Sequence, residues 1–175
     1  MSLMHCYEVT DRAGRRHPAT LADCLNVQRT PAWRQRVLDR SLHTVADGDA
    51  TLQVEKSFFY LDLGRGQAFL VHPPRERYRY RSHSTQLERM LAVLPLAMRG
   101  RVRQLRLVFG TEELREKLVA AEAGLDDRAV ELMKVAVLHD HPVLLTRPRL
   151  RLSLDRVDVQ GAQLLCQYDH SAAAF

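Results

Sequence analysis

Arginine recurs at every second position in three stretches of the chain, and this residue type at this spacing could bind phosphate groups. The three rows comprise Arg75, Arg77, Arg79 and Arg81, then Arg99, Arg101 and Arg103, then Arg147, Arg149 and Arg151. Residues two apart in an extended strand point to the same side, so each row would present a line of guanidinium groups. A guanidinium can donate two parallel hydrogen bonds to one phosphate. The spacing therefore predicts arginine-lined strands that bind nucleic acid or another polyanion.

Tyrosine and leucine residues alternate with these arginines. Tyr78 and Tyr80 lie within the first row, where their rings could stack on unpaired bases. Leu150 and Leu152 lie within the third row and would face a core. The residues predicted to bind nucleic acid are accordingly Arg75, Arg77, Tyr78, Arg79, Tyr80, Arg81, Arg101, Arg103, Arg147, Arg149 and Arg151.

The charges are unevenly distributed along the sequence. The 175 residues have a net charge of +5, and only three of the 26 basic residues are lysines. Residues 71–110 carry a net charge of +7, whereas residues 111–131 carry −4. This polarity favours a partner of opposite charge, either nucleic acid or an acidic protein surface.

The abundance of arginine is also compatible with roles other than phosphate binding. A GC-rich bacterial genome favours arginine codons whatever the function of the protein. Charged side chains on an edge strand also prevent aggregation. The rows could moreover pair with the acids of residues 111–131, in the same molecule or in a second copy. That pairing makes a protein–protein interaction module, such as a homodimer, an alternative function.

A second candidate for chemistry is the sequence His139-Asp140-His141, which follows an apolar segment. If this sequence is extended, the two histidines share one face, as in metal sites that take two imidazoles from one strand. If it is helical, His139 and Asp140 are adjacent candidate ligands. Such residues near the end of a helix also cap carbonyl groups or mark a turn.

The segment Ala136–Asp140 resembles the His-Asp dyad of the HD phosphohydrolase superfamily, in which the dyad ends an apolar helix and an earlier helix supplies another histidine. His83 stands in the place of that earlier histidine. The resemblance implies a metal-dependent phosphohydrolase, with His83, His139, Asp140 and His141 as candidate ligands of a divalent metal. The superfamily is all-helical, whereas the residues after His141 have the pattern of strands. An enzyme of this kind is therefore the alternative to a non-enzymatic binding domain without a cofactor.

The apolar periodicity predicts helices and strands that are intermixed along the chain. Strand patterns occupy residues 4–11, 51–72 as a hairpin that turns at 64–66, 102–109, 143–154 and 157–168. Helix patterns occupy a short segment that begins at Thr20, residues 30–47, residues 84–98, a segment that begins at residue 111 and a segment that begins at residue 126. The last of these segments is apolar on nearly all sides over residues 132–138. We expect the last of these helices to be the most buried. The absence of a regular strand–helix alternation predicts an α+β fold, with a mainly antiparallel sheet of about five to six strands and about four to five helices.

Length and composition fit a single globular domain over residues 1–175, in which 46% of the residues are apolar and 27% are charged. The longest strongly apolar run, residues 90–98, is too short to cross a membrane, and the first residues lack the pattern of a secretory signal. Three cysteines without a C-x-x-C sequence favour reduced thiols in a cytoplasmic protein. Residues 1–3 precede a second methionine and are a candidate cloning remnant, and residues 171–175 are expected to form a frayed tail.

Overall fold

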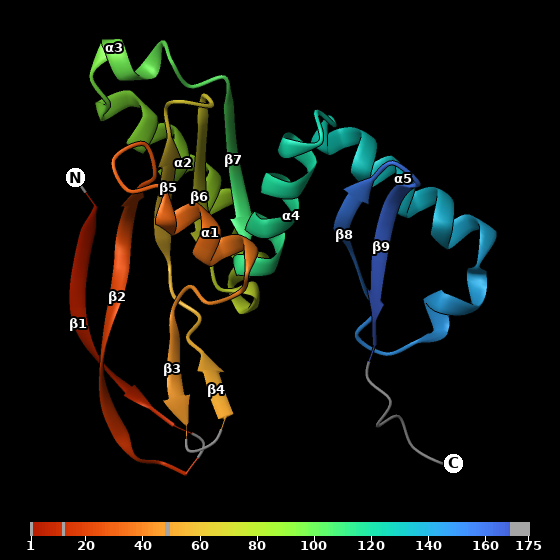
Figure 1. Ribbon diagram of the computed structural model, residues 1–175, viewed down its shortest axis with the longest axis horizontal. Coiled ribbons are helices and arrows are strands. Elements are labelled where there is room, and N and C mark those ends of the chain that lie inside the picture. The colour runs from red at the N-terminus through yellow and green to blue at the C-terminus, as the bar shows by residue number, and fades with distance from the viewer. Residues whose placement is uncertain (1, 12, 48–49, 169–175) are drawn as a thin grey trace. The chain divides into compact units, whose positions relative to one another are not determined.

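The computed structural model of the protein describes residues 2–11, 13–47 and 50–168 (Figure 1). By its internal contacts the chain divides into two compact units, residues 1–114 and residues 115–175. The expected tail at 171–175 lies outside the described residues. None of the described helices has the length and apolar character that a membrane span requires.

The first unit is built on a five-stranded sheet with the strand order β1-β2-β5-β6-β7. Its strands are β1 (Leu3–Thr10), β2 (Arg16–Asn26), β5 (Phe58–Asp62), β6 (Gln67–His72) and β7 (Gln104–Phe109). The pairs β1/β2 and β5/β6 are antiparallel, whereas β2/β5 and β6/β7 are parallel. The α+β prediction is therefore confirmed, and the five-stranded sheet is mixed rather than purely antiparallel.

Two long connections make the parallel pairs, because parallel neighbours cannot be joined by a tight turn. The first connection contains α1 (Ala32–Leu38) and a separate hairpin of β3 (Thr44–Asp47) and β4 (Ala50–Gln53). The second contains the 3-10 helix η1 (Pro74–Arg79), α2 (Tyr80–Val93) and α3 (Leu96–Arg99). This second connection carries the arginines of the first row.

Two helix predictions in the first connection and its preceding strand are wrong. The short helix expected from Thr20 is part of β2, where the Asp23 carboxylate binds Tyr7 and Lys56 instead of capping a helix. The helix expected over 30–47 ends at Leu38, because Arg40 and His43 have positive φ angles of 63° and 55°. A left-handed backbone at these two positions stops the helix and leads into β3.

The core of the first unit lies around the central strands β5 and β6, in which every residue is buried. Leu87 of α2 is buried in the cluster that these strands form, and Met90 packs against it. The hairpin predicted over 51–72 is confirmed for β5 and β6, with its turn at 63–66. The helix predicted over 84–98 is interrupted at Leu94, which is extended because the following Pro95 disfavours helical backbone there.

The second unit joins helices to a two-stranded sheet. It contains most of α4 (Thr111–Glu122), then α5 (Asp127–Asp140), the 3-10 helix η2 (Pro142–Thr146), and the antiparallel strands β8 (Arg151–Asp158) and β9 (Gly161–Gln167). The strand predicted from residue 143 thus begins only at Arg151. Its small core is formed by Ala120, Val130 and Leu154.

The prediction that the apolar half of α5 is the most buried helix is wrong. Leu132 is 70% exposed and Val135 is 62% exposed, whereas Val130 is fully buried. Val130 is the residue of α5 that lies in the core cluster of this unit. An apolar run alone therefore did not identify which side of the helix is covered.

Candidate functional site

The first arginine row does not form a strand. Arg75, Arg77 and Arg79 lie in η1, and Arg81 lies in the first turn of α2. Two prolines, Pro73 and Pro74, follow the end of β6 and stop the strand there. The chain then forms a 3-10 helix, in which residues two apart point in different directions. The arginines consequently spread around η1 instead of forming a line.

The second row is also not a strand. Arg99 ends α3, whereas Arg101 and Arg103 lie in the loop before β7. The Arg101 guanidinium donates to the backbone oxygen of Leu63 over 3.2 Å. Arg101 and Arg103 are both exposed.

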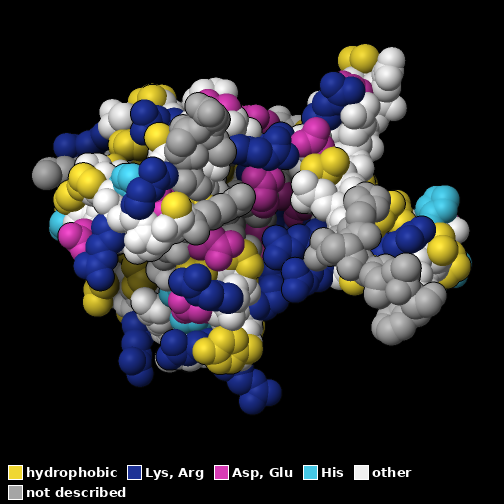
Figure 2. Space-filling view, turned by 90° about the horizontal axis from the view of Figure 1, so that it is seen from below, with side chains coloured by type: hydrophobic (Ala, Val, Ile, Leu, Met, Phe, Trp, Pro, Cys, Tyr) yellow, Lys and Arg dark blue, Asp and Glu magenta, His cyan; other side chains and the backbone are white. Residues whose placement is uncertain are grey.

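The third row lies in the other compact unit. Arg147 and Arg149 occupy the loop between η2 and β8, and only Arg151 is in a strand. Arg149 has a φ of 53°, and the Arg147 guanidinium lies 5.2 Å from the centre of the Tyr168 ring. The prediction of three arginine-lined strands is therefore wrong, and Figure 2 shows basic side chains spread over the visible face and interspersed with acidic ones.

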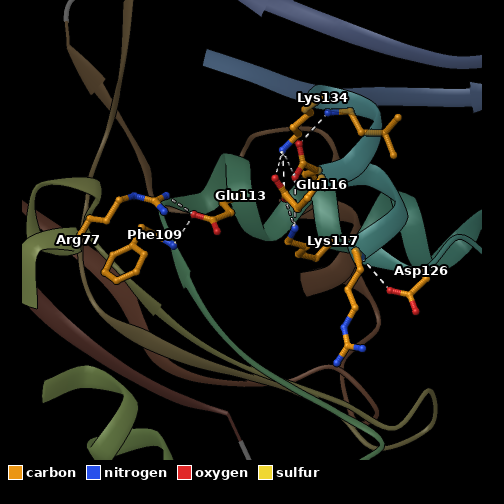
Figure 3. A network of polar contacts seen from close by, with 10 residues as sticks. Arg77, Phe109, Glu113, Glu116, Lys117, Asp126 and Lys134 are labelled. Atoms are coloured by element: carbon orange, nitrogen blue, oxygen red, sulfur yellow. Dashed lines mark hydrogen bonds and ion pairs between the residues drawn. The ribbon is translucent and has the colours of Figure 1, made fainter. Parts of the chain in front are cut away.

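What remains of the first row is a short, highly exposed segment, residues 75–81, which we name the basic segment. All of its residues except Glu76 are exposed, and Tyr78 and Tyr80 are 84% and 55% exposed. Arg77 is held by the molecule itself, because it donates to Glu113 over 2.6 Å and lies 4.8 Å from the centre of the Phe109 ring (Figure 3). The backbone N–H of Phe109 donates to the same carboxylate over 2.9 Å. Glu113 thus fixes η1 to the end of β7.

The sequence His139-Asp140-His141 lies at the exposed end of α5. His139 and Asp140 end α5, and His141 follows; all three are exposed. Within this sequence, His139 Nδ1 lies 3.1 Å from Asp140 Oδ1. His83 is buried in the first unit, whereas His139 belongs to the second, and the ligand set implied by the HD resemblance stays a prediction.

A different group of side chains surrounds His83. In the described part of the chain, His72, Glu76 and His83 form the one group of three candidate metal ligands, with their ligand atoms all within 4.8 Å of one another. We name this group the histidine cluster. His72 ends β6, Glu76 lies in η1 and His83 lies in α2. The end of the strand and the turn into η1 and α2 bring the three side chains together.

The two imidazole rings of the histidine cluster are stacked. Their centres lie 3.6 Å apart and their planes differ by 23°. Glu76 Oε2 lies 3.1 Å from His83 Nε2 and 3.7 Å from His72 Nδ1. The side chains of His83 and His72 are 7% and 5% exposed, while that of Glu76 is 27% exposed. The carboxylate therefore lies at the surface side of a buried histidine pair.

The surroundings of His72 favour its neutral imidazole form. Burial is the main cause that lowers the pKa of His72, and His83 and Arg79 lower it further, while Glu76 acts in the opposite direction. Neutral imidazole offers a nitrogen lone pair to a metal ion. His72 is thus in the protonation state that metal binding requires.

Ser57 next to the histidine cluster does not make a nucleophilic triad. Its Oγ lies 2.7 Å from His72 Nδ1, and the Glu76 carboxylate approaches that same nitrogen. In a catalytic triad the carboxylate contacts the opposite nitrogen of the histidine. The arrangement therefore supports ligand binding better than acyl transfer.

Of the three residues of the histidine cluster, the sequence pattern indicated His83 as a candidate ligand but did not indicate His72 or Glu76. His72 and Glu76 are four residues apart, and Glu76 and His83 are seven apart. These spacings match no common metal-binding motif, because the group spans the end of a strand, a 3-10 helix and an α-helix, so the sequence offers no signal for it.

Comparison with known proteins places the chain in one family. No curated protein matches it, and no solved structure does. The model of the family described as CpXC protein matches residues 12–134, a range that includes the basic segment and the histidine cluster. Because this match covers well over half of the 175 residues, the chain belongs to the CpXC protein family.

Proposed function

We propose that this protein binds single-stranded nucleic acid through the basic segment. The observation that carries the proposal is the exposure of four arginines and two tyrosines within seven consecutive residues. A large aromatic side chain that is 84% exposed, as Tyr78 is, covers no core in this unit. Bases that are not paired offer both a face for the tyrosine ring and a phosphate for each neighbouring arginine.

The charges of the basic segment support the same proposal. Among the residues that the structure describes, Arg75, Arg79 and Arg81 form no ion pair with a carboxylate, whereas Arg77 is bound to Glu113. One bound arginine fixes the segment, and the other three leave their charges exposed to solvent. This division of roles fits a surface that is positioned by the fold and open to a polyanion.

A cytoplasmic location is part of the proposal. Cys6, Cys24 and Cys166 are all free, and free thiols are usual where the surroundings are reducing. Nucleic acid is available there, and it is the partner we propose in preference to an acidic protein surface. Self-association into a homodimer and a contribution of Arg147, Arg149 and Arg151 stay predictions.

The proposal is tested with a fluorescently labelled single-stranded oligonucleotide, whose anisotropy is followed as protein is added. If the three arginines without an ion pair each neutralise one phosphate, the affinity should fall about twentyfold between about 50 and 200 mM salt. The double variant Arg79→Ala/Arg81→Ala should bind more weakly and show about one third of that dependence on salt. Tyr78→Ala should cost about tenfold on the single strand and little on a duplex.

The matched control removes two exposed arginines elsewhere, Arg29→Ala/Arg128→Ala, which changes the net charge by the same amount. If the control loses as much affinity as Arg79→Ala/Arg81→Ala, the basic segment is not the site and only general charge is at work. Undetectable binding, or binding that does not respond to salt, would remove the proposal. A separate double variant, Arg147→Ala/Arg149→Ala, tests the third row.

A further inference from the structure

We infer that His72, Glu76 and His83 bind a single divalent transition-metal ion of the zinc class. The inference does not depend on nucleic-acid binding, because it rests on different atoms. Two imidazoles and one carboxylate are a common ligand set for zinc, which prefers nitrogen and oxygen donors in a tetrahedral arrangement. Such a set leaves a fourth position for water or another ligand.

The distances between the ligand atoms suit such an ion. Bonds of about 2.1 Å in a tetrahedral site place neighbouring ligand atoms roughly 3.4 Å apart. The distances from Glu76 Oε2 to His83 Nε2 and to His72 Nδ1 are 3.1 and 3.7 Å, and so lie on either side of that value. The separations along these two edges therefore suit a tetrahedral ion.

An unsatisfied nitrogen in the cluster gives a second, independent reason for a ligand. Within the described chain, His83 Nε2, one of the proposed ligand atoms, is buried and has no hydrogen-bond partner. His83 Nε2 lies close to the Glu76 carboxylate without the geometry of a hydrogen bond. Buried polar atoms without a partner are uncommon in proteins, and a bound ion is one physical cause of them.

Binding requires one movement of a side chain. Because the rings are stacked and nearly parallel, their in-plane lone pairs do not converge on one point. Rotation of the His83 ring about its Cβ–Cγ bond would break the stacking and direct the lone pair of Nε2, which already lies 3.1 Å from Glu76 Oε2, toward the ion. His72 can stay in place, and its Nδ1 then gives up the Ser57 Oγ contact and binds the ion instead.

The position of the histidine cluster gives the ion a structural consequence. Glu76 lies inside the basic segment and His83 lies two residues after it, while His72 belongs to the sheet. A metal ion bound by these three side chains would link both the start of the basic segment, through Glu76, and the residues just after its end, through His83, to the end of β6. We therefore expect metal to raise the stability of the chain around η1.

The experiment uses the full chain, freed of metal with a chelator and then titrated with Zn²⁺ by calorimetry and with Co²⁺ by visible absorption. One ion should bind per chain, Co²⁺ should give the strong absorption of a tetrahedral site, and Zn²⁺ should raise the melting temperature. His83→Ala should weaken Zn²⁺ binding at least about a hundredfold, and Glu76→Gln at least about tenfold. Fluorescence of the single tryptophan, Trp33, checks that each variant is folded.

The matched control is His139→Ala/His141→Ala, which removes two exposed histidines of the other unit and should leave the stoichiometry and affinity unchanged. Should His83→Ala not fold, Glu76→Gln replaces a partly exposed side chain with one of the same size and decides the question. The inference is overturned if the wild-type chain binds no ion, if Glu76→Gln binds like the wild type, or if the control loses the site. Metal binding by Arg79→Ala/Arg81→Ala should be normal, which separates this result from a failure of nucleic-acid binding.

Discussion

At the residue scale, the buried histidines make the stability of the first unit depend on pH. His43 is 6% exposed, and its Nε2 accepts a hydrogen bond of 2.9 Å from the backbone N–H of Ala22. Burial, and next the charge of Lys56, lowers the pKa of His43 from 6.5 to about 4. A neutral ring is required for this hydrogen bond, since a protonated Nε2 cannot accept one.

The sign of the pH effect follows from the direction of the shift. Because the pKa of His43 is lower in the folded chain than in the unfolded chain, the neutral ring stabilises the fold above pH 6.5. This contribution to the free energy of unfolding is lost as the pH falls from 6.5 through about 4. For His43 the loss is of the order of 3 kcal/mol.

Urea unfolding of the metal-free chain, followed by Trp33 fluorescence at a series of pH values, measures this loss. His43→Gln should show a smaller slope with pH, with a remainder from His72, whose pKa burial also lowers; equal slopes would contradict the assignment.

The sequence indicates which residues could bind a ligand but not which residues surround them. It predicts His83 as a candidate metal ligand, and it predicts the tyrosines and arginines of the basic segment as one group. The contact of His83 with His72 and Glu76 depends on a turn of the backbone after β6, which no periodic pattern encodes. The apparent partner, His139, belongs to a different compact unit.

At the element scale, the turn between β5 and β6 depends on Gly66. Its φ is 70°, and a Cβ there would lie 2.9 Å from the backbone oxygen of Arg101. The oxygen of Gly66 also accepts hydrogen bonds from the N–H groups of Arg103 and Gln104, so the loop before β7 lies directly on this turn. Gly66→Ala should therefore strain both the turn and the loop.

We expect Gly66→Ala to lower the free energy of unfolding by about 2 kcal/mol or more, of which about 1 kcal/mol comes from the positive φ. Gly14→Ala separates the two causes, because Gly14 has a φ of 81° but nothing within 4 Å of the added Cβ. Urea unfolding of both variants gives the comparison. If Gly14→Ala loses as much stability as Gly66→Ala, the close approach to Arg101 has no measurable cost.

Elements were predictable where local pattern and tertiary contacts agree. The β5–β6 hairpin and α2 have both the apolar period and the glycine or proline positions of their final structure. β2 was missed because a Thr-x-x-Asp sequence resembles a helix cap, whereas in the fold Asp23 binds Lys56 across the chain. The alternating arginines predict strands because a spacing of two is the strand period, but Pro73 and Pro74 direct the first row into η1.

At the scale of the whole molecule, each compact unit has its own core and its own polar network. The parallel pairs β2/β5 and β6/β7 join residues that are far apart in the sequence, so pattern alone could not give the mixed sheet. In the second unit, the buried Glu116 joins the helices to β8 (Figure 3). It lies 2.8 Å from Lys134 Nζ and accepts a hydrogen bond of 2.8 Å from the backbone N–H of Leu154.

Removal of this carboxylate should destabilise the second unit by itself. Glu116→Ala leaves the Leu154 N–H unpaired and takes one carboxylate from Lys117 and Lys134, which keep Glu131, so we expect a loss of about 3 kcal/mol. Hydrogen exchange followed by mass spectrometry should become faster in peptides from β8 and β9 and stay unchanged in peptides from β5 and β6. Glu116→Gln is the matched control, since its amide oxygen can still accept from Leu154 and the loss should be smaller. Equally faster exchange in both sets of strands would mean that the chain unfolds as one cooperative unit, because a defect confined to one core would then have spread to the other.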